Sequence, residues 1–387
     1  MVMESTSVML TMPREVFPMS ELPPSAYLIA LASLPAIGPQ RLRQLCADRD
    51  FEKTWSALQQ NCWQPPESAS RELPLDVINE WHQFSAQFSV SQSWQRHCEL
   101  GVDIITIDDE NFPALLRDDP TAPFVLFVKG SLAVFSMPRV AIVGTRKSSA
   151  YGISVATRFG KELSQIGISV VSGLALGIDG AAHLGALQVA GARPLAIVGS
   201  GIDCIYPPSH RNLWNDICAR GLVLSEHPCG RAARAWHFPA RNRLIAALSD
   251  VVLVVESHDK GGALLTAVEA AQRGVPVMAV PGPITAPSSD GTNQLLYDGC
   301  SPVRDVDDIL IALGYSLRVG KKHDDRKVPS SEDEVVLSHI PWTPVALSTL
   351  ADATDYSLVE LAMALDRLEQ TGWIRRIGSL IERRGAE

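Results

Sequence analysis

The sequence predicts an α/β protein whose centre is a parallel β-sheet with helices on both faces. Short apolar runs recur from residue 139 onward, and most of them end at glycine or small polar residues. After these residues, apolar side chains recur at the spacing of a helix. Strands that alternate with helices pair in parallel, and such sheets are covered on both faces. The predicted strands are 140–143, 168–171, 195–198, 222–224, 251–255 and 275–280.

The first of these strands organises the rest of the domain. Residues 140–143 are all apolar, and Gly144 then lets the backbone turn tightly. Arg146 and Lys147 follow, just before a predicted helix at 151–166. Helix N-termini attract anions through unpaired N–H groups and aligned peptide dipoles. The junction is therefore suited to phosphate.

The composition shows that positive charge is concentrated in one part of the chain. The chain has 387 residues, enough for two or three domains, and its net charge is −9. Residues 139–250, however, hold 12 Lys and Arg against 6 Asp and Glu, a local charge of +6. This distribution excludes a globally basic nucleic-acid binder and indicates one basic region inside an acidic protein.

The N-terminal part predicts a loose tail at 1–22 and a helical domain at 23–98. Residues 27–47 read as helix, tight turn and helix, with Leu-Pro-Ala-Ile-Gly-Pro at the turn. The pattern resembles a helix-hairpin-helix, although a plain turn in a small bundle is the commoner explanation. Arg41 and Arg43 alone favour a phosphate contact there. Apolar alternation at 103–107 and a run at 124–128 predict two further strands flanking the main sheet.

The C-terminal part predicts a charged linker at 316–334 and a winged-helix domain at 335–387, after a central domain at 99–315. Helices are expected at 347–353 and 357–371, followed by a two-stranded wing. The domain carries 5 Lys and Arg against 7 Asp and Glu. Since acidic charge repels phosphate, we expect it to contact protein, or DNA only through the wing cations.

Further polar groups are expected beside Gly144, Thr145, Arg146 and Lys147, because the carboxyl ends of parallel strands share one edge. A glycine-rich turn precedes the helix that contains Asp179 and His183, and we expect the turn to offer amide groups to an anion. Asp179 reads as a helix-start residue and His183 as a packed or capping one. Residues two apart on a helix diverge, so of Arg241 and Arg243 one is expected to bind the ligand and the other to brace the site. The additional candidates are Ser172, Gly173, Phe238, Arg241, Asn242, Arg243, Lys260 and Gly261.

Several kinds of active site are missing from the sequence. The first predicted strand is not followed by Gly-x-Gly-x-x-Gly, and there is no P-loop and no Gly-x-Ser-x-Gly. No His and Cys set has zinc spacing, and paired carboxylates are few at the basic edge. We therefore expect a phosphate binder that is not an enzyme, with no catalytic residue, no metal and no cofactor.

Cysteine usage and hydropathy bear on the compartment. The seven cysteines include no Cys-x-x-Cys pair and are odd in number, which favours a reduced cytoplasmic setting. No stretch approaches the roughly 20 apolar residues of a membrane-spanning helix, and no signal peptide is seen at the N-terminus. No membrane partner is expected.

Taken in order, the motifs resemble those of the DNA-processing protein A family, also called DprA or Smf. The matching stretches are Val-Ala-Ile-Val-Gly-Thr-Arg at 140–146, Val-Val-Ser-Gly-Leu-Ala-Leu-Gly-Ile-Asp at 170–179, Gly-Ser-Gly-Ile-Asp-Cys-Ile-Tyr-Pro at 199–207 and Phe-Pro-Ala-Arg-Asn-Arg at 238–243. The resemblance runs from about 112 to 303. Where the family has Lys-Ser-Gly, this chain has Lys260-Gly261-Gly262, without the hydroxyl.

The resemblance implies an extended Rossmann fold, an N-terminal SAM-like or helix-hairpin-helix-like domain and a C-terminal winged helix. It implies single-stranded DNA as the ligand, bound at the candidate residues named above. It also implies loading of the RecA recombinase during DNA uptake and natural transformation, and a homodimer formed through the Rossmann domain.

Two other functions stay open at this point. A nucleotide phosphoribohydrolase of the lysine-decarboxylase-like family would share the sheet and the glycine-rich turns, and Gly261-Gly262 with Glu269 faintly matches its motif, but Pro-Gly-Gly-x-Gly-Thr is absent. A winged-helix regulator that senses a nucleotide would need duplex specificity, against which the acidic second helix argues.

Overall fold

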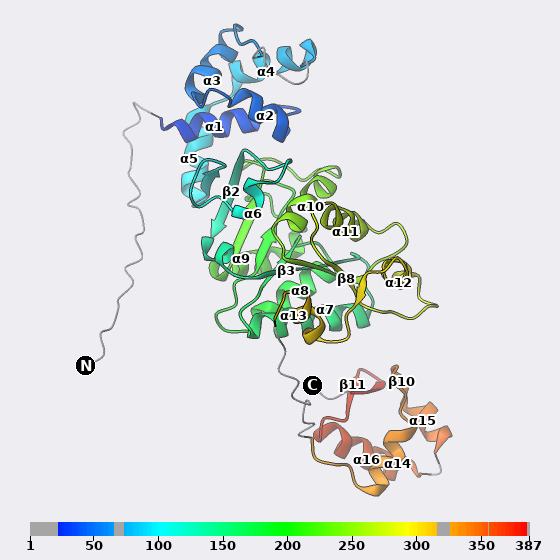
Figure 1. Cartoon of the computed structure of the whole chain (residues 1–387). Coiled ribbons are helices and arrows are strands. Elements are labelled where there is room, and N and C mark those ends of the chain that lie inside the picture. The colour runs from blue at the N-terminus through cyan, green and yellow to red at the C-terminus, as the bar shows by residue number, and fades with distance from the viewer. Residues whose placement is uncertain (1–21, 66–72, 316–325, 355, 385–387) are drawn as a thin grey trace, which may run out of the picture. The chain divides into compact units, whose positions relative to one another are not determined.

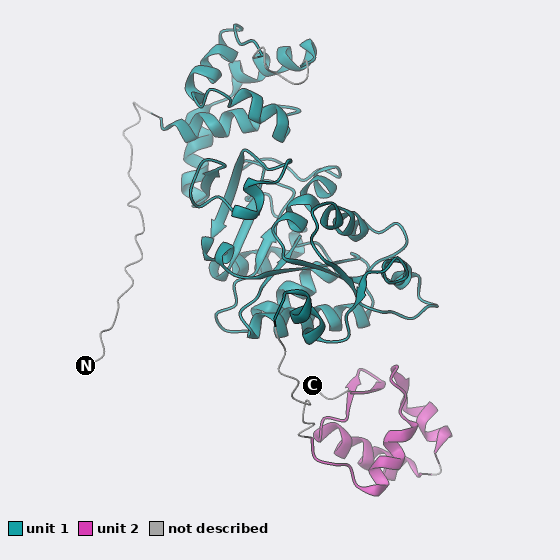
Figure 2. Cartoon of the chain, viewed as in Figure 1, with its two compact units in different colours: residues 1–317 teal, residues 318–387 magenta. Residues whose placement is uncertain are grey.

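The computed structural model describes residues 22–65, 73–315, 326–354 and 356–384. The chain forms two compact units, residues 1–317 and 318–387 (Figure 2). The tail predicted at 1–22 lies outside the described residues except for Leu22, and so do residues 316–325 of the predicted linker. Within the described part of the chain, every helix is too short or too polar to cross a membrane.

A nine-stranded sheet with the order β1-β2-β6-β5-β4-β3-β7-β8-β9 forms the centre of the first unit (Figure 1). From β6 to β9 all neighbouring strands are parallel, which confirms the predicted sheet. All six predicted runs form strands. The parallel strands are β3 (Arg139–Gly144), β4 (Ser169–Ser172), β5 (Leu195–Ile197), β6 (Leu222–Ser225), β7 (Val251–Glu256), β8 (Val277–Ala279) and β9 (Ser301–Pro302).

Two antiparallel strands extend one edge of the sheet, as the sequence predicts. β1 (Asp103–Thr106) pairs with β2 (Val125–Gly130), and β2 pairs with β6. The short helix α6 (Ala114–Arg117) lies between them in the chain. β3 is central: β4 to β6 lie on one side of it and β7 to β9 on the other. The strand order therefore reverses between β3 and β7, where sheets of this kind bind ligands.

Alternate residues of β3 supply two different hydrophobic cores, one on each face of the sheet. Val140 and Ile142 pack with α7 (Ala150–Gln165) and α8 (Ile178–Leu187). Ala141 and Val143 belong to the core beneath α10 (His237–Ala247) and α11 (Gly262–Gln272). Because side chains alternate along a strand, a fully apolar run buries both faces. The remaining helices of this sheet region are α9 (Arg211–Arg220), α12 (Asp290–Tyr297) and α13 (Val306–Ala312).

Among the described residues, five helices precede the sheet. The predicted helix, turn and helix is present as α1 (Pro24–Ser33) and α2 (Pro39–Leu45). They are followed by α3 (Phe51–Gln59), α4 (Leu75–Gln87) and α5 (Val90–Leu100). The helices share one hydrophobic core with α9 and with the inner residues of β2, β5 and β6. This shared core fixes the helical region against the sheet.

The C-terminal unit contains three helices and a three-stranded antiparallel sheet of order β10-β12-β11. Its elements are α14 (Ser331–His339), β10 (Val345–Ala346), α15 (Leu347–Ala353), α16 (Leu358–Gln370), β11 (Ile374–Ile377) and β12 (Leu380–Arg383). The linker was predicted to reach residue 334, but α14 already begins at Ser331. The Ser330 hydroxyl accepts from the Asp333 amide, and Asp333 forms an ion pair with Arg367, so these charged residues start a helix.

Candidate functional site

A groove of about 600 Å³ opens at the carboxyl edge of the sheet, where the strand order reverses. Its lining comes from the loop after β3, Ala175 and Asp179 after β4, the loop and helix after β7, α10 with the segment before it, and Tyr206. These segments lie far apart in the sequence, and the parallel sheet brings them to one edge. Most of the predicted site residues line it, namely Gly144, Thr145, Arg146, Lys147, Phe238, Arg241, Asn242 and Gly261.

The exposed lip of the groove carries its accessible positive charge. Arg146 and Lys147 are both exposed, and neither forms an ion pair within the described residues. The Arg146 guanidinium carbon lies 4.7 Å from the centroid of the Phe238 ring. The Tyr206 ring lies 5.4 Å from the same ring. The lip thus combines unpaired cations with aromatic faces, which suits both phosphates and bases.

The loop that carries these cations is held by β7. The Thr145 amide donates to the Glu256 carbonyl at 2.8 Å, and the Ser149 amide donates to the Glu256 carboxylate at 2.9 Å. Gly144 is required at the start of the loop, because a Cβ there would lie 2.5 Å from an Ile178 side-chain carbon and 2.8 Å from the Glu256 oxygen. The position of Arg146 is therefore set by packing and hydrogen bonds beneath it.

Arg241 belongs to the buried floor of the groove. Its side chain is only 5% exposed, and Nη1 donates to the carbonyl oxygens of Gly173, at 2.8 Å, and of Ile197. Burial lowers the pKa of the Arg241 guanidinium to about 10, and the charge of nearby Asp179 opposes this shift. The guanidinium lines the groove, and its Nη1 joins the backbone just after β4 and the end of β5 to α10.

Ser172 and Gly173 lie under the groove rather than along it. The Ser172 hydroxyl donates to the Ile142 carbonyl, and Ser172 is fully buried. The amide of Gly173 was expected to face a bound anion, but it donates to the carboxylate of Asp179, 3.1 Å away. The Ala175 amide does the same at 3.4 Å. This expectation is wrong because Asp179, in the first turn of α8, already occupies the anion position.

The carboxylate of Asp179 and the ring of His183, both on α8, are buried titratable groups of this region. Burial raises the pKa of Asp179, and Arg241 opposes that shift. His183 is completely buried, and neither ring nitrogen has a hydrogen-bond partner within the described residues. Burial is the main cause that lowers its pKa to about 3, so the ring is neutral at physiological pH. His183 is packed, as the sequence indicates.

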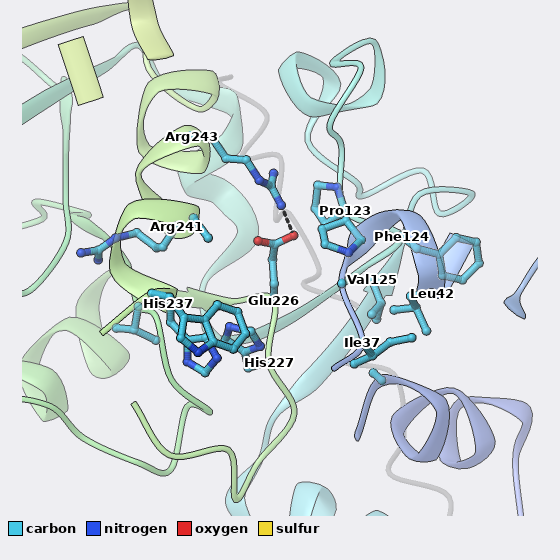
Figure 3. A pocket seen from close by; sticks show the side chains of 16 residues that line it. Ile37, Leu42, Pro123, Phe124, Val125, Glu226, His227, His237, Arg241 and Arg243 are labelled. Carbon is cyan, nitrogen blue, oxygen red and sulfur yellow. Dashed lines mark hydrogen bonds and ion pairs between the residues drawn. The ribbon is translucent and has the colours of Figure 1, made fainter. Parts of the chain in front are cut away.

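Arg243 points away from the groove, on another side of α10 (Figure 3). Its guanidinium pairs with the carboxylate of Glu226, and both side chains are largely buried. The pair lies in a small pocket of about 90 Å³, which also contains the rings of His227 and His237, 4.3 Å apart. Arg241 and Arg243 point in different directions, as expected for residues two apart on a helix. Hydrogen bonds hold the Arg241 side chain, and an ion pair holds that of Arg243.

The remaining candidates lie around the rim. Gly261 lines the groove, and its amide donates to the carbonyl of His258. Asn242 also lines it and donates to the carbonyl of Gly262 at 3.2 Å. Lys260 is exposed next to this turn but is not among the lining residues. It can reach a ligand only beyond the groove itself.

Tyr206 and Asp179 line the groove but are not among the residues that the sequence predicts for the site. Tyr206 is 48% exposed and contacts Phe238, and it follows the exit of the strand at 195–198. An aromatic residue close to the end of that predicted strand is the sequence feature that could have identified Tyr206 as a site residue. Asp179 was treated as a helix-start residue, which it is, but it also lies at the groove. The sequence reasoning assigned the anion contacts to the glycine-rich turn before Asp179 and therefore overlooked Asp179 as a groove residue.

Comparison with known proteins gives a consistent result. A family model described as DNA recombination-mediator protein A matches residues 103–314. The Smf protein of Synechocystis sp. is 34% identical over 296 residues, which cover 75% of this chain and 72% of that protein. The DNA processing protein DprA of Bacillus subtilis is 37% identical over 212 residues, 54% of this chain and 71% of that protein.

Solved structures agree with the sequence matches. The DprA structure from Streptococcus pneumoniae covers 74% of this chain and 97% of its own, with a TM-score of 0.60 and 30% identity. DNA processing protein A from Helicobacter pylori, solved in a study of its single-stranded DNA binding mode, covers 55% of this chain and 95% of its own. Its TM-score is 0.50 and its identity 30%.

Proposed function

Because this chain belongs to the DNA recombination-mediator protein A family, we propose that it binds single-stranded DNA in the groove and leaves its bonds intact. The observation that carries the proposal is the lip, where Arg146 and Lys147 are exposed and without ion pairs within the described residues. A polyanion gains from each cation that replaces a counterion. The similarity to the Helicobacter pylori protein supports the same ligand.

The aromatic residues of the groove favour single strands over duplex. Phe238 and Tyr206 present ring faces at the lip, and unpaired bases can stack on them. Phosphate contacts and stacking do not read base edges, so binding is tolerant of sequence. We propose that the binding residues are Gly144, Thr145, Arg146, Lys147, Phe238, Asn242 and Gly261, with Lys260 at the rim and Ser172, Gly173, Arg241 and Arg243 as their support.

The proposal includes no catalysis, because the groove offers no pair of carboxylates among its described lining residues. Asp179 is the one carboxylate among its described lining residues, and it accepts two backbone amides. General acid–base cleavage commonly uses a pair of groups with separated pKa values. A single buried carboxylate tied to amides is poorly placed for that work. Release of free base from a nucleoside monophosphate would contradict this part of the proposal.

Fluorescence anisotropy with single-stranded and duplex DNA of equal length, over a series of salt concentrations, tests the function. We expect tighter binding of the single strand. The double change Arg146→Ala and Lys147→Ala should reduce the slope of log affinity against log salt by about 1.4, about 0.7 for each lost cation.

Lys53→Ala with Lys161→Ala is the matched control, since both lysines are exposed and neither lines the groove. It removes the same charge and should leave the slope close to that of the original protein. Equal loss in both double variants would reject the groove as the binding site.

We also propose a cytoplasmic homodimer that loads RecA onto the bound strand, in keeping with the family. Two of the most exposed large apolar residues lie between β8 and β9: Ile284 at 89% and Tyr297 at 87%. Contiguous apolar patches mark interaction surfaces, and we propose that these two residues belong to one. Tyr297→Glu should convert a dimer into a monomer in sedimentation analysis and leave the affinity of each monomer for a short single strand unchanged.

The finer domain assignments are proposals as well. Order and spacing of α1 to α5 support a helix-hairpin-helix-like or SAM-like domain at 23–98, before a Rossmann-type domain at 99–315. The succession of α14, β10, α15, α16, β11 and β12 supports a winged helix at 335–387, with α14 added in front. Limited proteolysis, with mass spectrometry of the fragments, would test these boundaries.

A further inference from the structure

A second basic hollow lies where the helical region meets the sheet. It has a volume of about 380 Å³, and we call it the junction cleft. It is lined by the turn between α1 and α2, the first turn of α2, the segment 120–122 before β2, and Arg243 of α10. Three arginines, Arg41, Arg43 and Arg243, are among its lining residues, and no carboxylate is.

The charge of two of these arginines is not neutralised. Arg41 donates to the carbonyl of Ala36 at 2.7 Å, and Arg43 donates to the carbonyl of Ala122 at 2.8 Å. Neither has an ion pair in the part of the chain that the structure describes. Carbonyl partners orient a guanidinium without cancelling its charge, and each leaves other N–H donors available.

Two acidic groups beside the cleft are already paired. Glu226 is bound to Arg243, and both are mostly buried. Asp119, which precedes the lining segment, forms an ion pair with Arg273 at 2.6 Å and accepts from Thr121. The cleft therefore presents a net positive charge from Arg41 and Arg43, and an anion entering it meets no unpaired carboxylate among the lining residues.

The cleft and the groove each share an α10 arginine with the small pocket between them. Arg241 lines both the groove and the small pocket, and Arg243 lines both the small pocket and the cleft. Figure 3 shows the two arginines leaving α10 in different directions, with Glu226 beside Arg243. Trp236, 57% exposed, lies at the crossing, among the lining residues of the small pocket. An exposed indole there offers a stacking face between two cationic regions.

We propose that the junction cleft binds phosphodiesters of the same single strand, so that the DNA path runs from the lip past Trp236 to Arg41 and Arg43. The inference rests on the function proposed above and extends it. A short oligonucleotide fills the groove alone, whereas a longer one reaches the cleft. Arg41 and Arg43 then add affinity and salt dependence only when the strand is long enough.

The test compares two lengths of oligothymidylate, about 6 and about 20 nucleotides, within and beyond the usual 4–16-nucleotide footprint of a single binding module. Arg41→Ala with Arg43→Ala should weaken binding of the long strand about tenfold and reduce its salt slope by about 1.4, with the short strand unaffected. Arg41→Lys with Arg43→Lys should keep the slope, and Lys53→Ala with Lys161→Ala serves as the charge-matched control.

Each outcome decides something different. Three results would reject the junction cleft as a DNA-binding site without contradicting the groove. They are unchanged binding of the long strand, an equal loss of affinity for both lengths, and a loss of affinity seen only with duplex DNA. No binding of either length by the original protein rejects the proposed function itself. Competition by millimolar inorganic phosphate against the long strand, lost in the double alanine variant, would show a free-phosphate site and overturn the DNA path.

Discussion

Arg146 and Arg241 line the same groove, but their side chains are in opposite physical situations. Arg146 lies on the lip, exposed, with its guanidinium over Phe238 and no ion pair within the described residues. Arg241 lies in the floor, 5% exposed, with donors committed to the carbonyls of Gly173 and Ile197. A buried guanidinium that turned toward a phosphate would leave those carbonyls unpaired. One arginine is available to a ligand, and the other holds the site together.

The same division runs through the whole basic segment. Residues 139–250 carry a local charge of +6, but this number overstates what a ligand meets. Arg139 is 6% exposed and donates to the carbonyls of Leu248 and Phe135, and Arg243 is paired with Glu226. Among the exposed Lys and Arg of this segment, Arg146 and Lys147 line the groove and have no ion pair within the described residues. Other exposed cations, such as Lys161 and Arg211, lie outside the groove lining.

The largest expected effect comes from removing the floor arginine. Arg241→Ala leaves two buried carbonyls without donors and Asp179 without its nearby cation. Breaking a buried charged arrangement by deleting one partner costs about 3 kcal/mol or more. We expect a loss of that size in the free energy of unfolding of the first unit, measured by urea titration followed by tryptophan fluorescence.

The lip supplies the control for this measurement. Arg146→Ala should change the free energy of unfolding by less than about 0.5 kcal/mol, as surface substitutions usually do. If Arg241→Ala were equally mild, and weakened DNA binding as strongly as Arg146→Ala, the distinction between floor and lip would be wrong.

The second effect is a pH dependence that arises under the floor. The folded-state pKa of His183 is lowered by burial to about 3, below the unfolded value of about 6.5. Between these values the unfolded chain binds more protons, so stability is lost as pH falls through this window. The expected loss from this group is about 2 kcal/mol between pH 7 and pH 5.

Thermal unfolding of His183→Leu at pH 7 and pH 5 checks the assignment. The variant should lose less stability on acidification than the original protein. A residual slope is expected from His227, whose pKa burial also lowers to about 3. Identical pH profiles for both proteins would show that His183 is not the group responsible.

The fold was predictable because the same sequence pattern, a short apolar run followed by a helix, is repeated along the chain. Each of the six runs was long enough to bury two faces, and the small or polar exits marked where strands end. The sequence does not predict the start of α14, because the highly charged run from Ser331 to Glu334 is also typical of a solvated linker. Ser330 with Asp333 three residues later is a helix-start pattern, and it was the signal to use.

The site was predictable only in part, because the residue type does not reveal burial. Gly144 and Arg146 were located at the groove by topology, and Phe238 by its place in the basic segment and in the family motif. The position of Arg241 depends on which side of α10 faces β4 and β5, and arginine in a basic motif is normally exposed. The burial of Arg241 and Gly173 reflects tertiary packing that the local sequence does not encode.

A smaller effect separates stacking from charge at the lip. Phe238→Leu removes the ring that lies under Arg146 and beside Tyr206. Loss of one stacked base costs about 1 kcal/mol, or roughly fivefold in affinity for single-stranded DNA. Since no cation is lost, the salt slope should stay constant, and Phe238→Trp should retain affinity. A reduced slope in Phe238→Leu would mean that the ring acts mainly by positioning Arg146.

The smallest effect is expected in the C-terminal unit, which shows whether exposure alone makes an arginine useful. The side chains of Arg375 and Arg376 are 42% and 43% exposed, but Arg375 pairs with Glu382 at 2.7 Å and Arg376 with Glu369 at 3.4 Å. A phosphate would have to displace these carboxylates, and acidic neighbours repel it. Arg375→Ala with Arg376→Ala should therefore change single-strand affinity less than about twofold, measured beside the lip double variant. A tenfold loss would mean that ion pairing does not withhold an arginine from DNA, and the contrast between lip and floor would then rest on burial alone.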